Sequence, residues 1–246
     1  PIKEPIPVVP TCHYMMGGTP TNIHGQAFSR TDEKDFMVSG LFSVGEAACV
    51  SVHGANRLGG NSLLDLIVFG RAAGKHINEE LKSGGGVDKA SNEDIELAMS
   101  RLNTLNESES GYEVADVKKQ LQTCMQNYFG VFRRGEFMEK GVEELKEIRE
   151  KSENLYLKDK SIAFNTNRVE ALELQNLLEV AEATAISAMM RDESRGAHAR
   201  DDFPERDDEN WLCHSLYDPV EKKLGKRDVN FVPKEVEAFP PKMRSY

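Results

Sequence analysis

The spacing of apolar residues changes near Ser91, and this change restricts the folds open to the chain. Prolines and a glycine pair interrupt the first twenty residues and exclude a continuous helix there. From Ser91 to about Met190, apolar residues recur every three or four positions, which is the period of an amphipathic helix. Beyond Arg191 the chain becomes polar and rich in proline. We therefore expect a β-rich, loop-heavy first part, a helical second part and a small, irregular third part.

The apolar pattern also predicts individual elements. Residues 41–45 form a short apolar run ending in glycine, which is typical of a buried strand. An apolar helix is expected over residues 61–81, and its wide apolar surface predicts packing on several sides. Ser91 and Asp94 have the spacing of a capping box and predict a helix to about residue 106. Three further helices, near residues 114–132, 138–148 and 167–190, complete a predicted antiparallel bundle of four.

Composition excludes several classes of protein. The 246 residues carry a formal net charge of −10, which argues against a nucleic-acid footprint. No run approaches the ~20 apolar residues of a membrane-spanning helix. The four cysteines are far apart and form no Cys-x-x-Cys pair, which argues against zinc ribbons and iron–sulfur ligation and predicts no metal site. We expect reduced thiols in a cytosol-like compartment.

Residues 52–66 form the most informative segment for function. Arg57 stands directly before Gly59 and Gly60, and an apolar helix follows with Asn61 or Ser62 as its expected N-cap. A guanidinium grips a carboxylate with two parallel N–H donors, and a helix N-terminus favours an electron-rich ligand. The segment therefore predicts a site for an anionic substrate beside a polar cofactor.

Other candidates are weaker on their residues alone. Glu46 follows the predicted strand, where carboxylates of α/β folds accept hydrogen bonds from sugar hydroxyls. His13 lies on a loop between a proline and two glycines, and functional residues concentrate on loops. The remaining histidines are interpreted as structural: His24, His53, His76, His198 and His214. The charged stretches 191–200 and 206–211 are interpreted as solvated loops or as an inter-domain salt-bridge network.

Several of these segments stand in the order seen in one family. The chain resembles the C-terminal part of the succinate dehydrogenase/fumarate reductase flavoproteins, on the succinate dehydrogenase side, in residues 10–18, 44–46, 53–65, 193–198, 202–211 and 239–246. The resemblance covers essentially the whole chain, and its Met15-Met16 pair is of the bacterial type. It implies that His13 and Arg57 hold a dicarboxylate, that Glu46 bonds FAD, and that the backbone of Ser62 and Leu63 contacts the same cofactor.

The resemblance also implies an α/β plus all-α fold. Residues 1–87 correspond to the returning part of a Rossmann-like FAD-binding domain, together with the end of the return from the capping domain. Residues 88–190 correspond to an antiparallel helical bundle, and residues 191–246 to a small irregular α+β C-terminal domain. The implied reaction, part of the tricarboxylic acid cycle, is oxidation of succinate to fumarate by hydride transfer to FAD. The resemblance further implies that electrons would pass to an iron–sulfur subunit and, with membrane-anchor subunits, on to quinone. It implies a peripheral location at the cytoplasmic face of a bacterial inner membrane.

Some elements of the family pattern are not found in these residues. The Rossmann glycine motif, the flavin-linking histidine and the proton-shuttling arginine belong upstream in the family, so no catalytic residue is assigned here. Because the chain also begins Pro1 without Met, we expect a partial or processed chain that is inactive alone. The alternatives are a quinol-linked fumarate reductase, an L-aspartate oxidase and a non-catalytic helical interaction module.

Overall fold

The computed structural model describes residues 2–7, 13–31, 34–85 and 89–242. Cys12, the first residues of the 10–18 motif and the end of the 239–246 motif lie outside these ranges, so the expectation of a reduced Cys12 thiol is not addressed. The other three cysteines, Cys49, Cys124 and Cys213, are free thiols. Within the described ranges, no helix is both long and apolar enough to cross a lipid bilayer.

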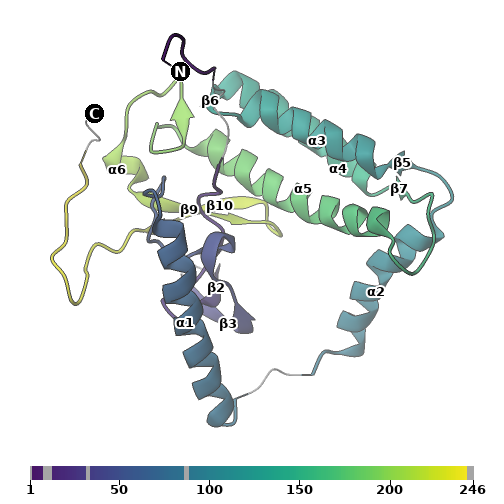
Figure 1. Ribbon diagram of the computed structural model, residues 1–246, viewed down its shortest axis with the longest axis horizontal. Coiled ribbons are helices and arrows are strands. Elements are labelled where there is room, and N and C mark those ends of the chain that lie inside the picture. The colour runs from purple at the N-terminus through teal and green to yellow at the C-terminus, as the bar shows by residue number, and fades with distance from the viewer. Residues whose placement is uncertain (1, 8–12, 32–33, 86–88, 243–246) are drawn as a thin grey trace.

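The N-terminal part pairs short strands with one long helix. Strands β2 (Gln26–Thr31) and β3 (Lys34–Phe42) form an antiparallel hairpin, and β1 (Thr19–Pro20) pairs in parallel with β4 (Ala48–Cys49). A 3-10 turn, η1 (Gly45–Ala47), lies between β3 and β4. Helix α1 (Asn61–Lys82) then runs beside the hairpin (Figure 1).

Helix α1 is packed less than its sequence predicts. Its large apolar side chains are 49–69% exposed at the positions Leu63, Leu64, Leu66, Ile67, Val68 and Leu81. The expectation of packing on several sides is therefore wrong for this chain. The predicted buried strand over 41–45 is also wrong, because β3 ends at Phe42 and Leu41 is half exposed.

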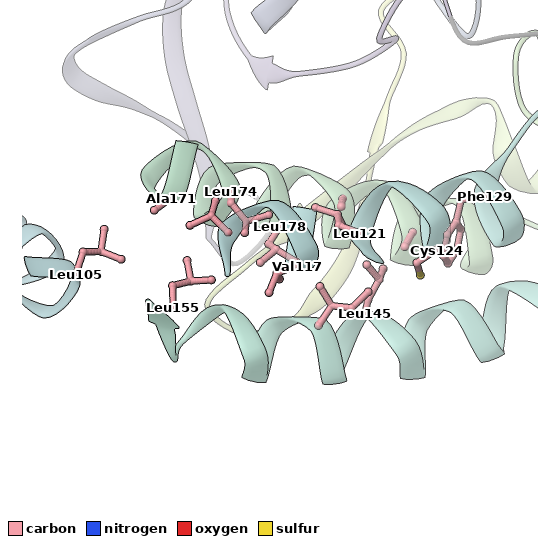
Figure 2. Packing of buried hydrophobic residues seen from close by; sticks show 14 of the residues in the cluster. Leu105, Val117, Leu121, Cys124, Phe129, Leu145, Leu155, Ala171, Leu174 and Leu178 are labelled. Carbon is pink, nitrogen blue, oxygen red and sulfur yellow. The ribbon is translucent and has the colours of Figure 1, made fainter. Parts of the chain in front are cut away.

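The helical part has a closed core. It is built from α3 (Val114–Phe129), α4 (Gly135–Ser152) and α5 (Thr166–Met190), whose axes run side by side (Figure 1). Strand β5 (Tyr112–Glu113) pairs with β7 (Leu155–Tyr156), which sets the start of α3 beside the end of α4. The helices therefore run antiparallel in sequence order. Their apolar faces meet in one cluster that includes Val117, Leu121, Leu145, Leu174 and Leu178 (Figure 2).

The first helix of the predicted four does not complete the bundle. Helix α2 (Asn92–Glu107) begins with the predicted capping box between Ser91 and Asp94. It contributes only Leu105 to the core, whereas Leu97 is 70% exposed. The bundle is therefore a three-helix core with α2 at its edge.

The C-terminal part packs against the end of the bundle. It contains β8 (Ala199–Arg200), the short helix α6 (Asp208–Trp211) and the hairpin of β9 (Cys213–Asp218) with β10 (Lys223–Asp228). Strand β8 pairs with β6 (Phe132–Arg133), the strand between α3 and α4. Hairpin β9–β10 crosses α5 on the side toward α1 (Figure 1). This part thereby joins the bundle to the N-terminal loops.

Candidate functional site

Arg57 lies on the loop that precedes α1, with its guanidinium over the ring of Tyr14. The guanidinium carbon is 4.7 Å from the ring centroid, which is a cation–π contact. The Nε atom is buried and has no hydrogen-bond partner among the described residues. A buried donor without a partner costs free energy, so this arrangement suits a site completed by a further acceptor. The contact with the ring does not consume the N–H donors, so the guanidinium keeps donors for an anion.

His53 and Asp65 form a buried pair beside Arg57. Nε2 of His53 lies 2.8 Å from Oδ2 of Asp65, whose side chain is 3% exposed. The imidazole also meets the Tyr14 ring edge-on, with centroids 5.8 Å apart. Nδ1 of His53 and Oδ1 of Asp65 are buried without partners among the described residues. Together with Nε of Arg57, three unsatisfied polar atoms belong to this one group of side chains.

The pKa of the Tyr14 phenol reflects the burial and the charges around this group. Burial, and then the negative charges of Asp65 and Glu46, raise the pKa of its phenol, and the Arg57 guanidinium opposes them. The phenol therefore stays protonated at neutral pH. A hollow of about 180 Å³ adjoins the group and is lined mainly by apolar side chains, from Val52, His53, Asn61, Leu64, Asp65, Val68 and Phe69.

The sequence alone favours a structural role for His53 and does not single out Tyr14 or Asp65. The available signal was the position of Asp65 in the second turn of α1, where its carboxylate lies near His53 twelve residues earlier. A carboxylate this close in sequence to a loop histidine and a glycine turn favours a hydrogen-bonded pair of histidine and carboxylate. Periodicity alone assigned position 65 to a helix and gave it no role.

Glu46 contacts the loop 13–18, which carries both His13 and Tyr14. The amide of Met15 donates to Oε1 of Glu46 at 2.9 Å, so Glu46 holds the backbone of that loop. Gly18 has a φ of 124°, and a Cβ there would lie 2.6 Å from the carbonyl oxygen of Ala47. His13 is exposed, and among the described residues no hydrogen bond or ring contact joins it to Arg57. Its neighbour Tyr14 makes the contact instead.

The helix start at Ser62 and Leu63 differs in one detail from the prediction. The N-cap is Gly60, with a left-handed φ of 81°, rather than Asn61 or Ser62. No side chain of the described ranges caps the helix, and its first turn holds no acidic residue. The amide groups at this end therefore lack side-chain acceptors, and the dipole is not neutralised locally. Leu63 is 65% exposed and Ser62 is partly buried.

The charged stretch near residue 193 forms a salt-bridge network. This is one of the two interpretations that the sequence allows, the other being a solvated loop. Glu193 is fully buried and accepts from Arg191, from Arg195 and from the amide of Asp207. Burial alone would raise the pKa of Glu193, but these donors outweigh it and hold the pKa below its ordinary value. His198 lies in the same network, and burial lowers its pKa to about 4. This histidine is therefore neutral at physiological pH.

Comparison with known proteins identifies the family of this chain. The model for "Fumarate reductase flavoprotein C-term" matches residues 118–246, more than half of the chain. The chain belongs to the succinate dehydrogenase/fumarate reductase flavoprotein family. A model for an FAD binding domain matches residues 1–63 of this flavoprotein chain, which include Arg57 and the start of α1.

Individual relatives agree with that assignment. The succinate dehydrogenase flavoprotein subunit of Coxiella burnetii is 50% identical over 98% of this chain, and that of Rickettsia bellii is 46% identical over 99%. Both are bacterial, as the Met15-Met16 pair predicts. A solved structure of a mutant Escherichia coli quinol fumarate reductase has a TM-score of 0.82, with 37% identity over 98% of this chain. The chain spans 41–42% of the two curated relatives and 40% of that solved chain.

Proposed function

We propose that these residues supply the dicarboxylate-holding side of an FAD-dependent succinate dehydrogenase. The observation that carries this proposal is the Arg57 guanidinium, which stacks on Tyr14 beside a helix start without a side-chain cap and whose buried Nε has no partner in the part of the chain that the structure describes. The names of the two bacterial relatives support the direction of the reaction.

The residues at this site fit a flavin. Gly59 and Gly60 have open space where a Cβ would stand, so a ligand can approach their backbone closely. The first turn of α1 has no side-chain cap, so the amide of Ser62 can donate to electron-rich atoms, whereas the amide of Leu63 donates to the carbonyl of Gly60 at 3.1 Å. Glu46 is exposed and can accept from hydroxyl groups. When bound, FAD would supply the acceptor for a hydride from the substrate.

The residues of this chain would act mainly by positioning. Arg57 would hold one carboxylate through two parallel N–H donors, and His13 would hold the same dicarboxylate from another side. Fixing both ends of a small, flexible substrate removes much of the entropic barrier to reaction. We assign no proton-transferring residue to this chain, and the proposed arginine shuttle belongs to another part of the enzyme.

We further propose the assignment of three regions. Residues 1–87 would form the returning portion of the Rossmann-like FAD-binding domain, residues 88–190 the helical domain, and residues 191–246 the C-terminal domain. The exposed apolar side chains of α1 support the first assignment, because exposed apolar patches mark surfaces that other elements cover. The enzyme would work with an iron–sulfur subunit and membrane-anchor subunits, peripherally at the cytoplasmic face of the inner membrane.

Turnover by the assembled complex tests the proposal. We expect succinate oxidation with a quinone acceptor to be faster than fumarate reduction with a quinol donor, and L-aspartate to be a poor substrate. Markedly faster fumarate reduction would favour the quinol-linked fumarate reductase, since both directions use the same clamp. Oxidation of L-aspartate at a comparable rate would favour L-aspartate oxidase.

The 246 residues expressed alone give a second test. We expect them to purify without tightly bound flavin and without turnover, because they contain no Gly-x-Gly-x-x-Gly motif and leave α1 uncovered. A yellow chain that oxidises succinate by itself would contradict this expectation and would also exclude the non-catalytic interaction module.

A further inference from the structure

The loop that carries Arg57 is held at two points by residues more than 130 positions later in the chain. At one end, Oγ of Ser51 lies 2.9 Å from Nε2 of His214 in strand β9. Toward the other end, the carbonyl of Ala55 accepts from the amide of Ala197 at 3.0 Å. Both contacts come from the C-terminal part, so the Arg57 loop is not positioned by its own neighbours alone.

The second contact is made by a tight turn. Arg195 and His198 exchange both backbone hydrogen bonds, at 2.8 and 3.0 Å, which leaves Gly196 and Ala197 as a two-residue hairpin loop. Gly196 has a φ of 58°, whereas Ala197 is not among the residues with positive φ. This combination is a type II′ turn, which places glycine at its first central position.

Gly196 leaves no room for a side chain against the Arg57 loop. A Cβ at this position would lie 2.6 Å from the carbonyl oxygen of Ala55 and 2.8 Å from its Cβ. Backbone atoms of Ala55 cannot rotate away as a side chain does, so the loop itself would have to move. Arg57 is two residues further along that loop.

Ion pairs and hydrogen bonds hold both ends of the turn in place. Glu193, fully buried, binds the guanidinium groups of Arg191 and Arg195, which precede and begin the turn. His198, which ends the turn, accepts from Arg133 at 2.8 Å and donates to the carbonyl of Arg191 at 3.0 Å. Arg133 belongs to β6, between two helices of the bundle core. The turn is thus attached to the most buried part of the molecule.

We infer that Gly196 and its type II′ turn are positioning elements that set the Arg57 guanidinium for dicarboxylate binding. The part of this inference that concerns binding rests on the proposed function of Arg57. The part that concerns the loop itself does not. A displacement of the loop changes how well the guanidinium meets a carboxylate, so substrate affinity should change more than the rate of the bound complex.

Gly196→Ala tests the inference, with Gly84→Ala as its matched control. Gly84 also has a positive φ, of 84°, but open space where its Cβ would stand, and it follows the far end of α1. Hydrogen exchange of the 246-residue chain should show the hydrogen-bonded amides of Ala197, Asn61 and Leu63, which donate to carbonyls of residues 55–60, exchanging at least about tenfold faster in Gly196→Ala than in Gly84→Ala. In the assembled enzyme, the Kd for malonate and the KM for succinate should rise at least about tenfold, with kcat changed less than threefold.

A second variant covers the case in which Gly196→Ala does not fold. Ala197→Pro removes the amide that donates to Ala55 and directs the ring Cδ at the same carbonyl oxygen, so it breaks this contact while Gly196 is kept, at a turn position whose φ is not positive. Exchange of the Asn61 and Leu63 amides within twofold of wild type, in whichever of these variants folds, would overturn the inference whatever the enzyme does. If wild-type enzyme neither oxidises succinate nor binds malonate, the proposed function fails, and the exchange data still decide the role of the turn.

Discussion

The helical bundle and the N-terminal region differ in how completely they bury their apolar residues. In α3, α4 and α5, residues such as Met138, Ile148 and Leu174 are at most 1% exposed, and each contributes about 1.5–3 kcal/mol by burial. Among the described residues before Ser91, only Ala27, Phe28 and Ala73 are buried apolar side chains. The bundle has a finished core, whereas the N-terminal region presents its apolar helix to solvent.

This difference separates two uses of apolar sequence. In the bundle, the apolar residues pack against one another within the chain, and these contacts fix its fold. The N-terminal region instead holds polar atoms that have no partners among the described residues, at Arg57, His53 and Asp65, beside an uncovered apolar helix. Unsatisfied polar atoms and exposed apolar surface in one place mark a region that binds something else.

A pair of leucine substitutions tests this comparison with the largest expected effect. Leu174→Ala removes a fully buried side chain from α5 and leaves a cavity, so we expect a loss of about 2–5 kcal/mol in the free energy of unfolding. Leu81→Ala makes the same change on α1, where the side chain is 62% exposed, and should stay within about 0.5 kcal/mol. Urea unfolding of the 246-residue chain, followed by circular dichroism, measures both.

The same pair gives a sharper result in the assembled enzyme. If α1 is covered there, Leu81→Ala should become costly while Leu174→Ala keeps its cost. Equal losses for both variants in the isolated chain would remove the distinction between the two regions.

The bundle illustrates what an apolar pattern predicts well. Positions such as Val117, Leu121 and Cys124 face the core because a helix repeats every 3.6 residues, and the capping box at Ser91 fixes a helix start. The same pattern predicted too much packing for α1 and a fourth bundle helix. Periodicity identifies which face of a helix is apolar, but it does not say whether this chain covers that face.

The candidate site was predictable only in part. Arg57 and the glycine turn could be identified because their chemistry is local to a few residues of sequence. The contact of Arg57 with Tyr14 joins residues 43 positions apart, and the contact of Ala55 with Ala197 joins residues 142 apart. Such contacts depend on tertiary packing, which no short motif encodes. The steric need for Gly196 is visible only once both loops are in place.

Arg57→Lys tests whether the N-terminal region binds the carboxylate of a substrate. Lysine keeps the positive charge but loses the planar fork that pairs with a carboxylate, and it stacks less well on Tyr14. We expect the succinate oxidation rate of the assembled enzyme to fall at least ~100-fold, or about 3 kcal/mol of transition-state stabilisation. Arg71→Lys is a suitable control, since Arg71 is exposed on α1 away from the loop. Normal turnover in Arg57→Lys would remove Arg57 from the substrate site.

The junction between the two regions should be sensitive to mild acid through His198. Its Nδ1 accepts from Arg133, which can only donate, and its Nε2 donates to a carbonyl, so the folded state holds it neutral. Its pKa is about 4 in the folded state against an ordinary value of 6.5, so below pH 6.5 the unfolded chain binds the proton more readily. This contribution to stability is complete above pH 6.5 and is lost as the pH falls toward 4, with a decrease of about 2 kcal/mol between pH 7 and pH 5.

His198→Gln keeps one acceptor and one donor without titrating, so its unfolding free energy should fall less over that range. Burial also lowers the pKa of His214, so the variant should retain part of the slope, whereas an unchanged slope would show that the junction does not depend on a neutral His198.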